Sequence, residues 1–225
     1  MLEVQNLYKR YLKIAALSGV NFAVPPGQVV GLLGLNGAGK TTLLKLIAGL
    51  LLPDRGEVRF LGKSPRRQRG KIIYLPEQNP WPESATPAQV AALLAGADPG
   101  FNRSRFQSLI EFLEVPRRSF AQMSKGQRAR ANLALALARR APLYLLDEPL
   151  AGIDLISRDR ILRALVREWR EDAALILSTH EVTEAETLFD RAIFLKEGRV
   201  VKDVLVEELR REGKSVVEAF KEVLG

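Results

Sequence analysis

The sequence predicts an α/β fold with a mainly parallel sheet, an N-terminal antiparallel β part and a small inserted α-helical part. Short apolar runs typical of buried strands alternate with amphipathic segments over much of the 225 residues. The first quarter instead shows alternating apolar positions, as in 20–24, which favours antiparallel strands. Residues 77–122 carry little β signal and two amphipathic segments, which indicates a helical insertion.

In the first half of the chain, turn and cap residues bound the expected elements. Pro25-Pro26-Gly27 forms a turn before a buried strand. Thr86-Pro87-Ala88-Gln89 is a capping box with proline at the first helical position, and it opens a helix. The expected strands cover residues 2–8, 17–24, 28–33, 57–61 and 71–75. The expected helices begin near residue 43, run from 86 to about 94, and cover 103–114.

The β/α alternation resumes after residue 122, where Ser124 can cap a helix. The further expected elements are a helix over 125–139, a strand over 143–147, a helix over 157–170, a strand over 174–178, a hairpin around 196–199 and two short C-terminal helices. We therefore expect a single domain over 1–225. Its core comprises 1–76 and 123–225, and its helical part comprises 77–122.

Composition limits the class of protein. The chain has no cysteine, which excludes disulfides, thiolate metal sites and a cysteine nucleophile. No apolar run approaches the roughly 18 residues that suggest a membrane span, and no signal peptide is visible, so we expect a soluble intracellular protein. Lys and Arg exceed Asp and Glu by 34 − 26 = 8. The densest basic cluster, 66–71, has no interleaved aromatics; this favours a solvated surface over a membrane face, with nucleic acid last.

The most specific motif spans residues 34–42, Gly-Leu-Asn-Gly-Ala-Gly-Lys-Thr-Thr, and matches the phosphate-binding loop pattern G-x-x-x-x-G-K-[ST]. A strand before the loop and a helix after it supply the context that the motif requires. Lys40 is expected to reach the β- and γ-phosphates of a nucleotide, and the Thr41 hydroxyl to bind Mg²⁺. The expected nucleotide-binding residues of this loop are Gly34, Leu35, Asn36, Gly37, Ala38, Gly39, Lys40, Thr41 and Thr42.

A second motif lies at the end of the apolar strand 143–147, where Asp147 is followed by Glu148. Buried carboxylates at a strand end are costly unless they face a cation or hydrogen-bond donors. Beside a phosphate-binding loop, Asp147 is expected to belong to the shell of the magnesium ion.

Met123-Ser-Lys-Gly-Gln127 lies between these two motifs, and with it the chain resembles the ATP-binding-cassette (ABC) ATPases over nearly its whole length. The resemblance implies a RecA-like core, ATP and Mg²⁺ as cofactors, and ATP hydrolysis. It implies that Ser124, Gly126 and Gln127 belong to a signature that contacts the γ-phosphate bound to the opposite subunit. The partner subunit is a second copy or a paralogous ATPase.

The same resemblance implies roles for single residues. Glu148 corresponds to the general base, and His180 to the histidine that senses the γ-phosphate. Lys40 completes the expected catalytic set. Tyr11 corresponds to the aromatic residue that stacks on adenine, although Tyr8 is close enough in sequence to take that role.

Two departures from the family pattern concern these motifs. Lys125 stands where the commonest signature has glycine, and adds a positive charge. Pro76 is followed by Glu77 and then Gln78, where the family commonly has glutamine directly after proline. The spacing to residue 86 favours Glu77 in that role, and a one-residue shift would give it to Gln78. A carboxylate at this position can bind Mg²⁺ through water.

The resemblance implies the ATP-binding subunit of an ABC transporter, peripheral on the inner face of the cell membrane, with a separate transmembrane permease as partner. The loop 74–77, the signature and the phrase 101–106 are most like those of ABC-2-type exporter ATPases. An importer ATPase is the alternative. So is a soluble ABC ATPase acting on nucleic acid or the ribosome, which the absence of a second cassette or a long coiled coil disfavours. No motif typical of a GTPase is present.

Overall fold

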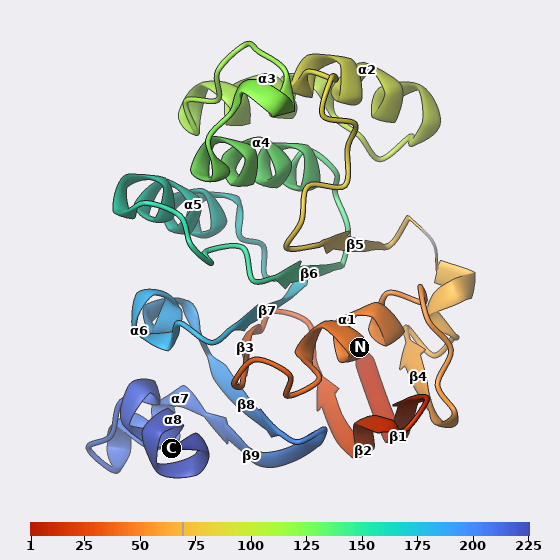
Figure 1. Cartoon of the computed structure of the whole chain (residues 1–225), viewed down its shortest axis with the longest axis vertical. Coiled ribbons are helices and arrows are strands. Elements are labelled where there is room, and N and C mark those ends of the chain that lie inside the picture. The colour runs from red at the N-terminus through yellow and green to blue at the C-terminus, as the bar shows by residue number, and fades with distance from the viewer. Residues whose placement is uncertain (69) are drawn as a thin grey trace.

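The computed structural model describes residues 1–68 and 70–225, which form two sheets and a helical layer (Figure 1). Arg69 of the basic cluster 66–71 lies outside the described residues. The antiparallel sheet has the order β2 (Ile14–Val24), β1 (Leu2–Tyr11), β4 (Arg55–Phe60). The larger sheet has the order β5 (Ile72–Leu75), β6 (Leu143–Asp147), β7 (Ala174–Thr179), β3 (Val29–Leu33), β8 (Arg191–Lys196), β9 (Arg199–Leu205).

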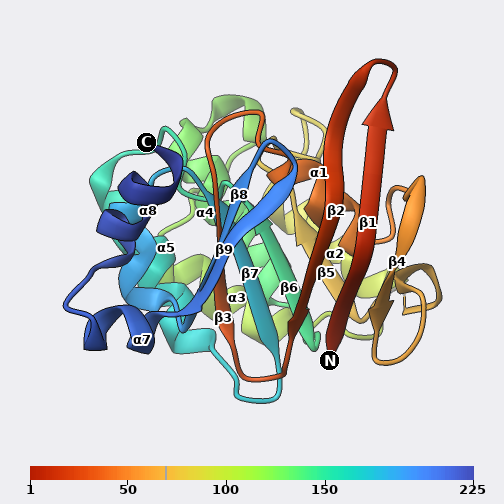
Figure 2. The ribbon, with the colours of Figure 1, turned by 90° about the horizontal axis from the view of Figure 1, so that it is seen from below.

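Every neighbouring pair in the larger sheet is parallel except β8 with β9, so the predicted fold class is confirmed. Figure 2 shows the β1–β2 hairpin running beside this sheet, with its turn projecting past the other elements. The helices are α1 (Lys40–Ile47), α2 (Pro87–Ala97), α3 (Arg103–Phe112), α4 (Lys125–Leu137), α5 (Leu155–Glu168), α6 (Val182–Ala185), α7 (Val206–Arg211) and α8 (Val216–Leu224).

The larger sheet is buried on both faces, as alternate residues of β6 demonstrate. Leu143 and Leu145 belong to an apolar cluster that joins the sheet to α1 and to the antiparallel sheet. Tyr144 and Leu146 belong to a second cluster, on the side of the helices α2 to α5. The sheet is therefore the common wall of two cores, and its strand order fixes where the loops at its edge can lie.

Local capping explains where the long helices begin. The predicted capping box of α2 forms, with the Gln89 amide donating to Thr86 Oγ1 (3.2 Å) and the Thr86 amide to Gln89 Oε1 (2.8 Å). Helix α5 begins two residues before the predicted start at 157, because Asp154 Oδ1 accepts the Ser157 amide (2.8 Å) and caps the helix there. The sequence pattern did not predict helix α6, which has only four residues.

The predicted helical part at 77–122 contains α2 and α3, and both contact α4, which lies beyond it in the sequence. The three helices share one apolar cluster with the sheet. The division of the domain at residues 76 and 123 stays a prediction. Over residues 1–68 and 70–225, no helix has the length and apolar character that a bilayer crossing requires.

Gly31 allows the strand that leads to the phosphate-binding loop to pass close to an aromatic ring. A Cβ atom at this position would lie 2.8 Å from two carbons of the Phe189 ring. We expect Gly31→Ala to lower the free energy of unfolding by about 1–3 kcal/mol through overpacking, measured by urea denaturation. The matched control is Gly96→Ala in α2, where a Cβ meets nothing within 4 Å. It should raise the free energy of unfolding by about 0.5–1 kcal/mol. Equal stability of the two variants would contradict this account.

Candidate functional site

The candidate site lies where three parallel strands end together. In the register of the sheet, Leu33 of β3 is opposite Thr179 of β7, and Asp147 of β6 is opposite Ser178 of β7. The carboxyl ends of these strands therefore share one edge, the position at which open α/β sheets bind ligands. The phosphate-binding loop and the residues after β6 and β7 leave the sheet at this edge.

The loop 34–42 fits its surroundings through glycine at two positions. A Cβ atom at Gly34 would lie 2.5 Å from the carbonyl oxygen of Leu195. Gly39 has φ +106°, and its Cβ would lie 2.5 Å from the carbonyl oxygen of Ala16. Helix α1 starts at the next residue, so the backbone amides of the loop lie at a helix N-terminus. Anions bind at such positions.

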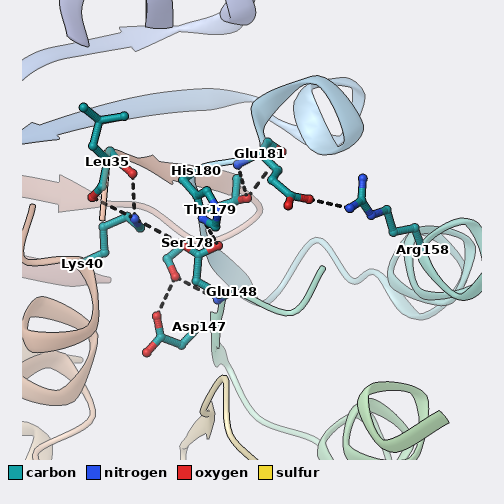
Figure 3. Close-up of polar contacts among 10 residues, drawn as sticks. Leu35, Lys40, Asp147, Glu148, Arg158, Ser178, Thr179, His180 and Glu181 are labelled. Carbon is teal, nitrogen blue, oxygen red and sulfur yellow. Dashed lines mark hydrogen bonds and ion pairs between the residues drawn. The ribbon is translucent and has the colours of Figure 1, made fainter. Parts of the chain in front are cut away.

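Lys40 lies at the centre of the site and is nearly buried (Figure 3). Its Nζ donates to the carbonyl oxygens of Gly34 (2.7 Å) and Leu35 (3.3 Å). The same Nζ forms an ion pair with Glu148 Oε1 at 3.0 Å, and the two side chains are only 6% and 8% exposed. Because both charges are desolvated, removing either one would leave the other without compensation.

Glu148 is held in an unusual backbone conformation, with φ +48°, in the left-handed region that a glutamate rarely adopts. Its amide lies 3.1 Å from both the carbonyl oxygen and Oγ of Ser178, which fixes the peptide. Its Oε2 is 3.0 Å from His180 Nδ1. The pairing of Oε1 with Lys40 lies outside hydrogen-bond geometry, so within the described residues this buried oxygen has no hydrogen-bond donor.

Asp147 differs from its neighbour because both its oxygens accept hydrogen bonds. Ser178 Oγ donates to Oδ1 (2.7 Å), and the Tyr74 hydroxyl donates to Oδ2 (3.0 Å). Burial raises the pKa of the Tyr74 phenol well above its ordinary value, and the charge of Asp147 and its hydrogen bond raise it further. The phenol therefore stays protonated and continues to donate to the carboxylate.

The side chains expected to bind the metal offer oxygen donors, which suit magnesium rather than a softer metal. Over the described residues, no three histidine, aspartate or glutamate side chains lie close enough to bind a metal ion by themselves. Asp147, the hydroxyl of Thr41 and the carboxylate of Glu77 are all hard oxygen donors. Magnesium is commonly held by one or two such groups together with phosphate oxygens and water. The residues present therefore fit a metal that arrives with a nucleotide.

Glu77 and Gln78 line the same cleft of about 650 Å³, which Glu148 also lines. The cleft separates the end of β5 from the start of α4, where Lys125 forms part of its wall. Since both side chains reach this cleft, the geometry favours neither as the residue that corresponds to the family glutamine.

Tyr11 and Tyr8 lie on the long hairpin and are 44% and 41% exposed. Tyr8 packs along the neighbouring strand, because a Cβ atom at Gly19 would lie 2.9 Å from its hydroxyl oxygen. Tyr11 lies beside the hairpin turn opposite Ile14, with Lys9 Nζ 5.9 Å from its ring centroid. Both rings have an exposed part, so the choice between them stays a prediction.

Signature residues Ser124 and Gln127 lie away from this edge. They form the capping box of α4, with the Gln127 amide 3.3 Å from Ser124 Oγ and the Ser124 amide 3.0 Å from Gln127 Oε1. Helix α4 belongs to the helical layer, well separated from α1 in Figure 1. Within 1–68 and 70–225, no hydrogen bond or ion pair joins 124–127 to 34–42. One chain therefore does not bring the two motifs together.

Gly126 joins the signature to the loop that precedes α5. A Cβ atom at Gly126 would lie 2.5 Å from Ser157 Oγ and 2.6 Å from Asp154 Oδ2. These two side chains are bonded to each other at 2.7 Å, and the hydrogen bonds from Ser157 hold the pKa of Asp154 below its ordinary value. Sequence reasoning missed this contact and the donors Ser178 and Tyr74, because each joins segments that lie far apart in the sequence.

Comparison with known proteins identifies the family of this chain. The sequence model described as "ABC transporter" matches residues 17–151, more than half of the chain. The chain belongs to the ABC transporter family. This cassette is similar to the ABC transporter ATP-binding protein YtrB of Bacillus subtilis, with 32% identity over 98% of this chain and 77% of the relative. It is also similar to the aliphatic sulfonates import ATP-binding protein SsuB of Rhodopseudomonas palustris, with 34% identity over 98% of this chain and 80% of the relative.

Solved structures support the same assignment. An ATP-binding subunit of an ABC transporter has a TM-score of 0.85 and 32% identity, with 99% of each chain covered. A dimeric ATP-binding cassette bound to ADP and Pi has a TM-score of 0.82 and 26% identity, covering 91% of this chain and 98% of the other. The ABC cassette described here is therefore the ATP-binding and ATP-hydrolysing subunit of an ABC transporter, and the family predicted from the sequence is confirmed.

The contact of Gly126 with the cap of α5 gives a prediction about stability in this ABC cassette. Gly126→Ala should lower the free energy of unfolding by about 1–3 kcal/mol, because the new methyl group overlaps Ser157 and Asp154. Ser157→Gly removes two of the three overlapping atoms. In a double-mutant cycle followed by urea denaturation, the double variant should therefore be more stable than the sum of the single effects, by about 0.5–3 kcal/mol. Strict additivity would mean that the two residues do not touch.

Proposed function

We propose that this ABC ATPase binds two ATP molecules between two subunits arranged head to tail, and that closure of the dimer drives export through a separate membrane subunit. One observation carries the proposal. Lys40, Asp147, Glu148 and His180 converge at one edge of the sheet, whereas the signature lies on a different part of the chain. A second subunit would supply the missing half of each site.

The phosphate-binding loop has the groups needed to bind the nucleotide. Its amides from Gly34 to Thr42 are available for phosphate oxygens, and Lys40 carries a charge that the γ-phosphate can share. Phosphate binding would exchange the bonds of Lys40 to two loop carbonyls for stronger, charge-assisted ones. Tyr11 is our candidate for the ring that stacks on adenine, with its exposed position beside the hairpin turn as support.

Thr41, Asp147 and Glu77 are proposed to hold Mg²⁺, the last of them through water. The ion supplies charge neutralisation between the β- and γ-phosphates when it is bound. The chain orients the Asp147 carboxylate. Tyr74 and Ser178 donate hydrogen bonds to its two oxygens, so the carboxylate cannot rotate freely.

In the proposed hydrolysis, the two carboxylate oxygens of Glu148 have different roles. Its Oε1 lacks a hydrogen-bond donor within the described chain and is proposed to accept the proton of the attacking water. Its Oε2 contacts His180, which holds the carboxylate in orientation and is proposed to face the γ-phosphate. The water oxygen attacks phosphorus, the bond to the bridging oxygen breaks, and ADP and inorganic phosphate leave.

The signature residues Ser124, Gly126 and Gln127 are proposed to contact the γ-phosphate held by the opposite subunit. They occupy the N-terminus of α4, where backbone amides favour an anion. The dimeric cassette bound to ADP and Pi, with a TM-score of 0.82, supports a dimer as the working unit. Whether the partner is a second copy or a paralogue is open to measurement of subunit composition.

Transport would take place through a permease subunit, so we propose that the ATPase is peripheral on the inner face of the membrane. Export is favoured by the likeness of residues 74–77 and of the signature to ABC-2-type exporters. It is also supported by similarity to the SkfA peptide export ATP-binding protein SkfE of Bacillus subtilis, 29% identical over 94% of this chain and 92% of the relative. Nucleic acid remains the least favoured partner.

Import is the second candidate, because SsuB of Rhodopseudomonas palustris is named as an import protein. The experiment that separates the two is purification of the ATPase with its membrane subunit and reconstitution into vesicles. With the ATPase on the outside, ATP-driven accumulation of substrate in the vesicle indicates export. ATP-driven release of preloaded substrate indicates import.

Glu148→Gln should lower the ATPase rate at least about 100-fold while leaving ATP binding intact, because the base is lost and the binding groups remain. The variant should accumulate as an ATP-bound dimer, measured by light scattering after size-exclusion chromatography. The control is Glu171→Gln, an exposed glutamate outside the site, which should behave as wild type. Normal turnover by a Glu148→Gln variant that stays monomeric with ATP would exclude Glu148 as the base.

Glu77→Ala should reduce stimulation of the ATPase by the membrane subunit more than Gln78→Ala does. The physical reason is that a carboxylate at position 77 can hold magnesium through water, and its charge is lost in the variant. The measurement is the ratio of ATPase rates with and without the membrane subunit in vesicles. Equal or reversed effects would assign the role to Gln78.

A further inference from the structure

Arg158, in the first turns of α5, forms ion pairs with two glutamates, and neither pair belongs to the site described above. Its Nη2 lies 2.6 Å from Glu181 Oε2, and its Nη1 lies 2.8 Å from Glu184 Oε1. Glu181 is the residue directly after His180, and Glu184 lies in α6. Figure 3 shows the guanidinium reaching from α5 toward the segment that carries the histidine.

On one side, Arg158 is linked to the signature through its neighbour in the chain, Ser157. The residue before it, Ser157, is bonded to Asp154, and both side chains are packed against Gly126. A displacement of Gly126 toward α5 would therefore push the first turn of that helix, because the space beside Gly126 is too small even for a methyl group.

On the other side, Arg158 is attached to the catalytic edge. Glu181 donates its amide to Thr179 Oγ1 (2.9 Å), which anchors it at the end of β7. His180, between these two residues, contacts Glu148, whose other oxygen pairs with Lys40. A movement of Glu181 therefore reorients the ring that holds the carboxylate.

The ion pairs of Arg158 differ from the surface ion pairs of this helix in the burial of the arginine. The side chain of Arg158 is 15% exposed, whereas that of Arg163, paired with Asp159 on the same helix, is 71% exposed. Exposed pairs of that kind contribute little, since solvent screens them. Within the described residues, the buried atom Arg158 Nε also lacks a hydrogen-bond partner. Because such an atom is costly, a small shift of α6 against α5 that gave it an acceptor would be favoured.

We propose that Arg158 is a positioning residue that couples the two ATP sites of the dimer. The coupling runs within one subunit, from the signature that contacts the partner's nucleotide to the histidine and base beside its own nucleotide. Binding of ATP by the partner moves Gly126 and the cap of α5, and Arg158 transmits the shift through Glu181 to His180. The inference rests on the proposed head-to-tail dimer and adds a residue and a direction of coupling to it.

The test uses the fact that His180 is the only histidine in the chain. Protein labelled with ¹⁵N-histidine therefore gives the imidazole signals of one residue. In the wild-type protein, formation of the dimer with Mg²⁺ and a non-hydrolysable ATP analogue should shift these signals. In Arg158→Gln, a dimer confirmed by light scattering should form, and the His180 signals should keep the positions that they have in the nucleotide-bound monomer at low protein concentration.

Kinetics provide the second measurement. Arg158→Gln should lower kcat about tenfold, change KM for ATP less than about twofold, and reduce the Hill coefficient for ATP toward 1, since it removes coupling rather than binding. Glu184→Gln removes the ion pair between Arg158 and α6 and leaves the one with Glu181. It should lower kcat and the Hill coefficient less than Arg158→Gln does. This second variant decides the matter if Arg158→Gln does not fold. Arg163→Gln is the matched control and should behave as wild type.

The possible outcomes separate the two proposals. A wild-type response of both the Hill coefficient and the His180 signals in Arg158→Gln and Glu184→Gln overturns the role of Arg158. So does a lowered kcat with both of these responses intact, because it indicates a loss of stability alone. Failure of the wild-type protein itself to dimerise or hydrolyse ATP overturns the proposed function, and with it this inference.

Discussion

The parallel pairing of β6, β7 and β3 is the constraint on which the site depends. Because Asp147 is opposite Ser178 and Leu33 is opposite Thr179, three loops leave the sheet within one small region. Side chains from segments separated by more than a hundred residues in the sequence meet there without any long-range motif. A slip of one residue in a strand would turn its buried side chains to the opposite face and move its carboxylates away from the loop. The two apolar clusters, one on each face, prevent such a slip.

The sequence was sufficient for the fold class and for the family, because each motif is local. A glycine loop between a buried strand and a helix, or two carboxylates after an apolar strand, can be recognised within ten residues. Cap residues such as Thr86 and Ser124 placed helix starts for the same reason, whereas the Asp154 cap went unrecognised and the start of α5 was placed two residues late. The division of the domain at residues 76 and 123 stays a prediction. The choice between Glu77 and Gln78 also stays a prediction, since both residues line the same cleft.

Apart from the Asp154 cap, the contacts that the sequence did not predict join segments distant in the chain. Tyr74 donates to Asp147 across 73 positions, and Ser178 does so across 31. No local pattern marks either residue as a donor, because their role is to satisfy a buried carboxylate rather than to touch a ligand. The packing of Gly126 on Ser157 is of the same kind. Such contacts follow from the register and the packing of the sheet, which a single sequence does not contain.

The backbone of Glu148, with φ +48°, has a consequence for the engineering of this protein. A non-glycine residue in that region carries strain of about 1–3 kcal/mol, so glycine or asparagine there would fit the fold better than glutamate. Because Glu148 also compensates the buried charge of Lys40, a library selected only for resistance to heat should replace the two residues together and yield robust proteins without turnover. A library selected for growth that depends on transport should retain Glu148. Position 148 is where the two selections give opposite answers.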